Sequence, residues 1–276
     1  MTDFNERPLI VDQDADARFR DIIRRMGRNP DDRWISGYVD YLWNHERHFL
    51  EVREGDLHGK TVLELGCNYG AGAVVLAALG ADVAGVDVDA ALVVAARANV
   101  ARYGFQHRVE LVASQDGRRL PYSDATFDLV VCASVLEYVD AETLSTLQRE
   151  VDRVLRPDGR IFVMGTSNRL WPREVHSGRW FINYVPLACD RWFGSRDHQR
   201  GVTPWRVRYG FGAGYVNLDW LDGGRTYVTA RGRFPGCSGR ALRVGFRIAR
   251  AFGVTLGMLT PSMCLTLQKT RSMPRA

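Results

Sequence analysis

The sequence predicts a doubly wound α/β fold with a mostly parallel, seven-stranded sheet, N-terminal helices and an inserted cap. Short apolar runs alternate with helix-forming stretches along residues 57–168, a pattern typical of strands joined by right-handed crossover helices. A glycine-rich loop follows the first apolar run, at the place where such folds bind ligands. The length of 276 residues fits one large domain, or one domain with an elaboration.

The individual elements follow from periodicity and from their end signals. Residues 16–54 read as helical, because Tyr38, Tyr41 and Phe49 fall on roughly one face of a helix. Residues 127–136 contain a continuous apolar run at 129–133, as a central parallel strand should. The expected strands are residues 57–66, 81–89, 108–114, 127–136, 160–168, 225–231 and 262–269, and the helices after the first strand are residues 70–80, 90–104, 141–159 and 238–253.

Composition limits the class of protein. Hydrophobic residues make up 46% of the chain and charged residues 25%, ordinary values for a globular protein. The five cysteines are scattered without a CxxC pair, so we expect neither a disulfide framework nor a metal site. The polar N-terminus does not resemble a secretory signal, and no run approaches the roughly 18 apolar residues of a membrane span. We therefore expect a cytoplasmic protein without a transmembrane segment.

Charge is divided unevenly along the chain. Residues 1–150 contain 16 basic and 25 acidic residues, whereas residues 151–276 contain 21 basic and 7 acidic residues. Only Lys60 and Lys269 are lysines, so nearly all the positive charge is arginine, which binds phosphate and carboxylate through paired contacts. Genome base composition can explain the arginine bias, but the segregation points to an anionic partner for the C-terminal half.

The glycine-rich loop reads "VLELGCNYGAGA" at residues 62–73. Its glycines, Gly66, Gly70 and Gly72, do not follow the G-x-G-x-x-G spacing of dinucleotide-binding loops. Asn68 stands midway between Gly66 and Gly70. Asparagine tolerates left-handed backbone better than most other residues, so we expect Asn68 to preserve the geometry of the loop.

At these residues the chain resembles the class I S-adenosylmethionine-dependent methyltransferases, whose first motif is an acid followed by alternating glycines. Four further stretches resemble the family in the same order: "VAGVDVD", "ASQDGRRLPYSDATFDLVVC", "VLEYV" and "REVDRVLRPDGRIFV". The resemblance covers about residues 60–168. It implies the Rossmann-like methyltransferase fold, the cofactor S-adenosyl-L-methionine and the product S-adenosyl-L-homocysteine.

The resemblance also implies the residues that bind the cofactor. Asp87 would accept the ribose hydroxyls, and Asp116 would meet the adenine amino group. The full expected set is Glu64, Gly66, Cys67, Asn68, Gly70, Asp87, Val88, Asp116, Gly117 and Ser134. Structural roles are the alternatives: a helix cap for Glu64, a turn for Asp87, a loop acid at position 116, and packing for Glu137 and Tyr138.

We expect the chain to divide into four segments. These are an N-terminal helical segment at residues 1–55, a cofactor-binding core at 56–168, a cap or acceptor region at 169–235, and a C-terminal helix and last strand at 236–276 that complete the core. Residues 168–222 hold five of the seven tryptophans. A segment this long is usually functional rather than a plain connection, although tryptophans also form the core of such caps.

The segment "TSNRLWPREVHSGRWFINYVP" resembles bacterial methyltransferases of glycan or lipid-glycan assembly. His176 is the candidate catalytic base, with Glu174 orienting it; the alternative is a histidine bonded to backbone. We expect O-methylation of a small molecule or glycan, with an anionic acceptor as one option. An RNA or protein methyltransferase and a non-catalytic nucleotide-binding module of the same fold are the alternatives.

Residues 238–253 carry four arginines at helical spacing, Arg240, Arg243, Arg247 and Arg250. Leu242, Phe246, Ala249 and Phe252 fall on another face. The arginines form either a solvated face on a core-packed helix or a basic face for phosphate or for peripheral contact with a membrane surface. No nucleic-acid-binding module is visible, so nucleic acid is not the expected partner.

Overall fold

A computed structural model of the protein describes residues 9–114, 119–186, 189, 200–212, 214–234, 239–251 and 253–270. The chain divides into two compact units. The first unit comprises residues 1–117 and 229–237, and the second comprises residues 118–228 and 238–276. Each unit is described separately below.

The strands belong to one seven-stranded sheet with the order β3-β2-β1-β4-β5-β7-β6. Their bounds are β1 (Thr61–Leu65), β2 (Asp82–Asp87), β3 (Val109–Ala113), β4 (Phe127–Ala133), β5 (Leu155–Ser167), β6 (Tyr215–Asn217) and β7 (Ser262–Lys269). The pairs β1–β2, β2–β3 and β4–β5 are parallel, whereas β7 runs antiparallel to both β5 and β6. This confirms the predicted mostly parallel, doubly wound sheet.

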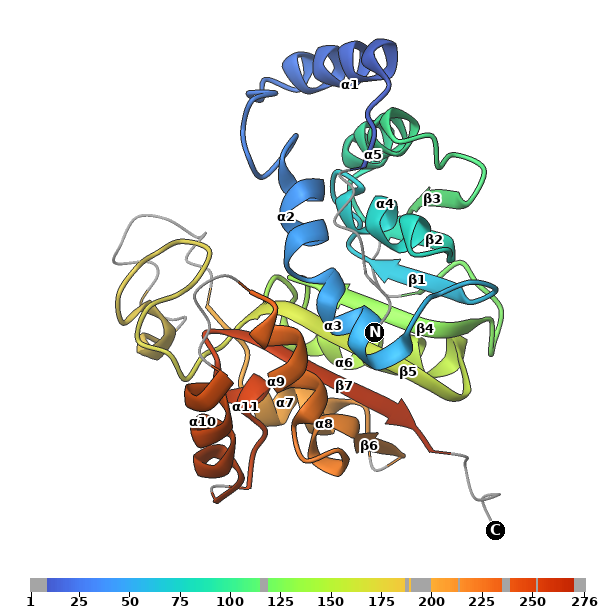
Figure 1. Cartoon of the computed structure of the whole chain (residues 1–276). Coiled ribbons are helices and arrows are strands. Elements are labelled where there is room, and N and C mark those ends of the chain that lie inside the picture. The colour runs from blue at the N-terminus through green and yellow to red at the C-terminus, as the bar shows by residue number, and fades with distance from the viewer. Residues whose placement is uncertain are drawn as a thin grey trace. The chain divides into compact units, whose positions relative to one another are not determined.

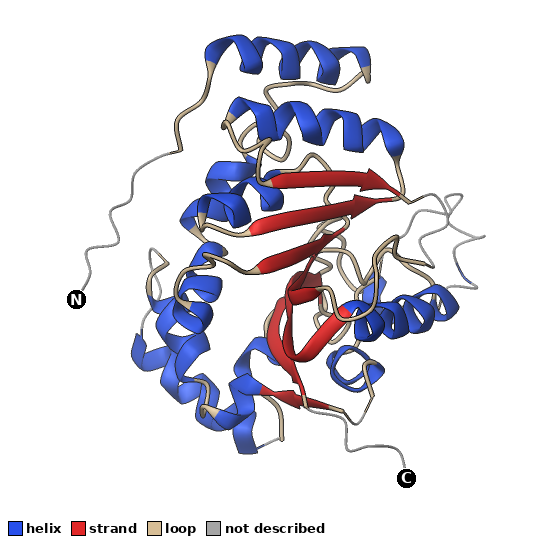
Figure 2. Ribbon diagram, turned by 90° about the vertical axis from the view of Figure 1, so that its right-hand side faces the viewer, coloured by secondary structure: helices blue, strands red, loops and turns tan. Residues whose placement is uncertain are grey.

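The first unit alternates strands and helices from β1 to β3 (Figures 1 and 2). Its helices are α1 (Gln13–Arg25), α2 (Tyr38–Asn44), α3 (Arg47–Glu54), α4 (Ala71–Ala78) and α5 (Ala90–Arg102). Asp89 caps α5 by accepting a hydrogen bond from the backbone N–H of Ala91 at 2.8 Å. α1 packs against α5 through Phe19, Ile23 and Ala95, all fully buried, so the N-terminal helix is held by burial of its apolar face.

The second unit carries β4 to β7 and most of the helices that follow α5. These helices are α6 (Ala141–Val154), α7 (Pro204–Gly210), α8 (Leu218–Leu221), α10 (Gly239–Ala251) and α11 (Leu256–Leu259), with a 3₁₀ turn at Ile182–Tyr184. Asp140 caps α6 by accepting from the N–H groups of Glu142 and Thr143. α6 ends at Val154, and β5 begins at the next residue, so the helix is shorter than the predicted range of residues 141–159.

The prediction of a strand at residues 225–231 is wrong. Arg225–Gly232 forms helix α9. The strand that takes its place in the seven-stranded sheet is β6, which lies within the region assigned to the cap. Tyr227 and Ala230 are the buried residues of the predicted strand, and their spacing of three is helical. Asp222 starts the helix by accepting hydrogen bonds from the N–H groups of Gly224 and Thr226, a local signal that outweighs the β-branched residues.

Among the described residues, none of the helices combines the length and the apolar character that a bilayer crossing requires.

Candidate active site

The loop that follows β1 has a left-handed backbone at alternate positions. The φ angles are 66° at Gly66, 45° at Asn68 and 75° at Gly70. The prediction that Asn68 adopts this conformation is therefore confirmed. The N–H groups of Gly66 and Cys67 both donate to the carbonyl oxygen of Val86, at 2.8 and 3.1 Å, so the end of β2 anchors the start of the loop.

Two glycines at the start of α4 leave space that a side chain would fill. A Cβ at Gly70 would lie 3.0 Å from both the Cβ and the carbonyl oxygen of Ala96. A Cβ at Gly72 would lie only 1.9 Å from Oε1 of Glu64. Gly72, which was not among the predicted site residues, is therefore what allows the carboxyl group of Glu64 to lie against the first turn of α4.

Glu64 is buried, with 4% of its surface exposed. Burial is the main reason that the pKa of its carboxyl group is raised to about 8. The charge of Asp87 also raises this pKa, whereas the hydrogen bond from the N–H of Ala73 lowers it. Its Oε2 atom has no hydrogen-bond partner among the described residues. Glu64 thus carries an unsatisfied buried acceptor beside the glycine loop, where a donor or a cation would be stabilised.

Asp87, the last residue of β2, joins the loop to the next helix. Its Oδ2 accepts from the N–H of Asn68 at 2.8 Å, and its Oδ1 accepts from the N–H of Asp89 at 3.1 Å. A carboxylate has about four acceptor positions, so further hydrogen bonds to a ligand remain open to it. The neighbouring Val88 is 59% exposed and Cys67 is 2% exposed.

The other predicted cofactor residues lie elsewhere. Ser134, at the end of β4 in the second unit, has a φ of 53°, and its hydroxyl donates to the carbonyl oxygen of Gly165 at 3.1 Å. Asp116 and Gly117 lie outside the described residues, so their predicted roles stay predictions.

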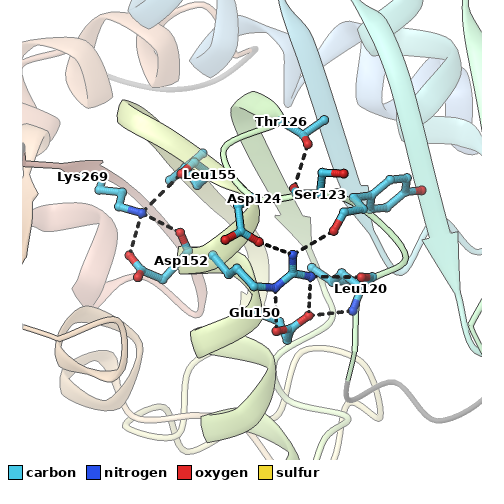
Figure 3. Close-up of polar contacts among 10 residues, drawn as sticks. Leu120, Ser123, Asp124, Thr126, Glu150, Asp152, Leu155 and Lys269 are labelled. Carbon is cyan, nitrogen blue, oxygen red and sulfur yellow. Dashed lines mark hydrogen bonds and ion pairs between the residues drawn. The ribbon is translucent and has the colours of Figure 1, made fainter.

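The segment that follows residue 118 is fixed by an arginine of α6. The Arg153 guanidinium donates to the carbonyl oxygens of Leu120 and Tyr122 at 3.1 and 2.8 Å, and pairs with Asp124 at 2.8 Å. Glu150 completes the network by binding Arg153 at 2.7 Å and accepting from the N–H of Leu120 at 3.0 Å (Figure 3). These bonds tie the loop before β4 to α6.

The histidine predicted as a base, His176, bonds to two acids, with its ring to Glu137 and with its backbone to Glu174. Its Nε2 lies 2.9 Å from Oε1 of Glu137, whose side chain is fully buried. Glu174 instead accepts hydrogen bonds from the backbone N–H groups of His176 and Ser177. Glu174 thus holds the backbone of the turn that carries His176, whereas Glu137 contacts the ring. The predicted role of Glu174 in orienting His176 stays a prediction.

Glu137 follows β4 within "VLEYV", and sequence reasoning left it with a packing role as one alternative. It also accepts from the N–H of Ser167, the last residue of β5, at 3.0 Å. Tyr138 is 62% exposed, with its ring centroid 5.9 Å from that of His176. The signal that could have identified Glu137 was an acid four residues after a strand that is apolar at residues 129–133.

Several groups shift the pKa of His176. Burial lowers it, but the hydrogen bond to Glu137 and the charges of Glu137 and Glu174 outweigh burial, so the pKa lies above its ordinary value of 6.5. The side chain is 27% exposed, and its Nδ1 has no hydrogen bond among the residues that the structure describes. The histidine is thus a partly accessible group whose basicity is raised by a buried carboxylate.

A left-handed glycine loop after β1 and a carboxylate at the end of β2, in this sheet, are typical of α/β enzymes that bind an adenosyl cofactor. Residues 63–163 match the family model described as "Methyltransferase domain". A ubiquinone biosynthesis O-methyltransferase of Thiobacillus denitrificans is 31% identical over 180 residues, which are 56% of this chain and 74% of that protein. The protein of the same name in Pseudomonas paraeruginosa is 31% identical over 169 residues, covering 54% and 68%.

A solved structure shows the same fold at lower identity. It is a chain of the complex between the Haloferax volcanii Trm112 methyltransferase activator and a candidate methyltransferase, with a TM-score of 0.53 at 19% identity, covering 95% of this chain and all of that one. The chain belongs to the class I S-adenosylmethionine-dependent methyltransferases. It is an enzyme whose cofactor is S-adenosyl-L-methionine.

Proposed function

We propose that the enzyme methylates a hydroxyl oxygen of a small acceptor and that His176, held by Glu137, is the general base. The observation that carries this proposal is the 2.9 Å contact between Nε2 of His176 and the buried Glu137. An oxygen acceptor benefits from a base, because a hydroxyl loses its proton as it gains the methyl group. The names of the relatives, ubiquinone biosynthesis O-methyltransferase, agree with an oxygen acceptor.

The residues of the chain would then have the following roles in the reaction. Bound S-adenosyl-L-methionine supplies an activated methyl group on its sulfonium. His176 would take the hydroxyl proton at Nδ1 as the acceptor oxygen gains the methyl group that the cofactor supplies. Glu137 stabilises the resulting imidazolium by charge, and Glu174 fixes the turn through its bonds to the backbone.

We also propose that the loop of the first unit holds the cofactor. Oε2 of Glu64 is buried without a partner among the described residues, which suits it to a cationic group of the cofactor. The positive φ angles at Gly66, Asn68 and Gly70 turn the backbone so that a ligand can approach closely. Asp87 would accept the ribose hydroxyls, as the family resemblance implies.

Residues 169–235 are proposed to recognise the acceptor. Trp180, Phe181 and Tyr184 are 63%, 60% and 53% exposed, and their rings lie in a chain with centroids 6.0 and 6.4 Å apart. Exposed aromatic rings bind apolar or sugar rings by stacking. This favours a ring-bearing acceptor, either a phenolic small molecule or a glycan.

The test is methyl transfer from labelled S-adenosylmethionine to matched phenols, glycosides and amines. We expect hydroxyl acceptors to react and the amines not to. His176→Gln should lower kcat by about a hundredfold or more, the usual contribution of a general base, with S-adenosylhomocysteine affinity unchanged. His107→Gln, a change at an exposed loop histidine, is the matched control. Wild-type turnover in His176→Gln, or a preference for amines, would overturn the proposal.

A pH profile separates a basic role from a structural one. A base works only when deprotonated, so activity should fall as the pH drops through the raised pKa of His176. Glu137→Gln removes the charge that raises this pKa, so the acidic limb of the profile should move to lower pH. A limb that stays in place would show that Glu137 does not control the titrating group.

A further inference from the structure

Helix α10 presents two neighbouring stripes to solvent. Phe246 and Ala249 form its buried side, with Phe246 packed over Gly224. On the outward side, Val244 and Ile248 are 55% and 54% exposed. They are four residues apart, so they lie one turn apart on one face. The arginines, all exposed, form the adjacent stripe: Arg240, Arg243, Arg247 and Arg250.

Most of these arginines are not used inside the protein. Arg250 lies over the ring of Trp220 at 5.7 Å. Within the described ranges, Arg240, Arg243 and Arg247 form no ion pair or hydrogen bond. Residues 223–276 contain ten basic residues and no acidic residue, so no carboxylate nearby in the sequence compensates this charge.

A solvated face on a core-packed helix explains the arginines but not the aliphatic stripe. Outward positions of such a helix are normally polar, yet Val244 and Ile248 are more than half exposed at the middle of the outward face. A nucleic acid would be attracted by the arginines but gains little from aliphatic groups. A second copy of α10 would bring like charges together. A surface that is both anionic and apolar matches both stripes.

We propose that the outward face of α10 binds the surface of a bilayer that contains anionic lipid. Val244 and Ile248 would enter the boundary between headgroups and acyl chains, and the arginines beside them would contact lipid phosphates. A helix with this pattern lies in the interface rather than crossing it. The inference concerns a surface separate from the residues proposed for catalysis and does not depend on the identity of the acceptor.

The experiment measures sedimentation of the whole chain with vesicles of phosphatidylcholine, with and without phosphatidylglycerol. We expect binding only to the vesicles that contain phosphatidylglycerol, and weaker binding as salt is raised. Each arginine near an anionic surface contributes about a fivefold change in affinity. The triple change Arg240→Gln, Arg243→Gln and Arg247→Gln should therefore weaken binding by roughly a hundredfold.

Two further variants make the test specific. Arg24→Gln, Arg28→Gln and Arg206→Gln together remove the same charge from exposed positions outside α10 and should change binding only a few fold. Val244→Ser with Ile248→Ser keeps every charge and should weaken vesicle binding by about tenfold or more, since burial of each aliphatic side chain contributes to binding. Unchanged melting temperature and S-adenosylhomocysteine affinity would show that each variant is folded.

Four outcomes would overturn the proposal. The first is equal binding to both kinds of vesicle, or to neither. The second is equal loss of binding in the α10 triple variant and in the charge-matched control. The third is binding of a single-stranded RNA homopolymer that depends on the arginines but not on Val244 and Ile248, which would assign the face to nucleic acid. Self-association abolished by the serine variant would likewise assign it to a second copy of the chain.

Discussion

Replacing Glu64 by glutamine should stabilise the cofactor-free enzyme and weaken its hold on the cofactor. The pKa of Glu64 rises from 4.5 to about 8 in the folded chain, chiefly through burial. A raised carboxyl pKa means that the folded chain keeps a proton that the unfolded chain loses. Stability is therefore lost as the pH rises from about 4.5 to about 8. Glutamine is neutral at every pH in this range, so the variant does not lose this stability as the pH rises.

The magnitude follows from the same numbers. At pH 7 the loss extends over the interval from 4.5 to 7, on the order of 3 kcal/mol at 1.36 kcal/mol per pH unit. The glutamine amide must occupy the place of the unpartnered Oε2, which costs about 1–3 kcal/mol. A net gain of up to about 2 kcal/mol should raise the melting temperature by up to roughly 8 °C for a chain of this size.

Thermal unfolding of wild type and Glu64→Gln at pH 5 and pH 8, without cofactor, tests whether the substitution stabilises or destabilises the fold. The difference in melting temperature should be small at pH 5 and largest at pH 8. A variant that melts below the wild type at pH 8 would refute the reasoning, because it would mean that the carboxyl group is not held neutral by burial.

Calorimetry tests the functional side of the same prediction. If the positive charge of S-adenosylmethionine ionises Glu64 on binding, the wild type should release up to about nine-tenths of a proton at pH 7. The cofactor's own amino group also titrates near pH 8, so the informative quantity is the difference between wild type and Glu64→Gln in buffers of different ionisation enthalpy. Equal proton release in both would remove Glu64 from contact with the cofactor's charge.

Three further predictions concern single side chains. Asp87→Ala should weaken S-adenosylhomocysteine binding about tenfold or more, since hydrogen bonds to a charged group contribute roughly 1.5–3 kcal/mol; unchanged calorimetric affinity in a folded variant would contradict its role. Gly72→Ala should destabilise the fold by about 1–3 kcal/mol, because the new Cβ would meet Glu64 at 1.9 Å, and a second change, Glu64→Ala, should recover part of the lost melting temperature. Trp171→Ala removes a 40% exposed ring that donates to the carbonyl oxygen of Leu259. The KM for the acceptor should change, while the affinity for S-adenosylhomocysteine stays within a few fold. A large fall in melting temperature with normal turnover would instead show that Trp171 belongs to the core of the cap.

The core of the fold was predictable because its signals are local and redundant. β1 and β2 are mostly apolar, and β1 is followed by Gly66 whereas β2 ends at Asp87. β4 is apolar at residues 129–133, and helices α5 and α6 carry the caps Asp89 and Asp140. Burial on both faces forces these strands to be apolar along their length. The last strand was predicted at the bounds it has in the structure, Ser262–Lys269.

Two features were beyond local reading for physical reasons. β6 has three residues, and among the described residues it pairs with β7. Because β7 lies about fifty residues further along the chain, the formation of β6 depends on this distant partner rather than on a pattern in its own sequence. Packing remained an alternative for Glu137, because its contact is with His176, which lies on a turn held by Glu174 and far from Glu137 in the sequence. Sequence shows that an acid follows an apolar strand but not which side chain reaches it.

Asn68 illustrates how the loop accepts a departure from the family's glycine. A left-handed conformation costs an ordinary L-residue about 1–2 kcal/mol, and asparagine is among the residues that visit it most readily. The same conformation lets the N–H of Asn68 donate to Oδ2 of Asp87 at 2.8 Å, and a hydrogen bond to a charged acceptor contributes roughly 1.5–3 kcal/mol. The two energies are of similar size, so the bond offsets most or all of the strain and the loop keeps its shape without the glycine. Because the bond uses only backbone N–H, it does not occupy the asparagine side chain, which stays available to a ligand at the loop. The substitution therefore leaves the geometry proposed to hold the cofactor in place and adds a polar group to it.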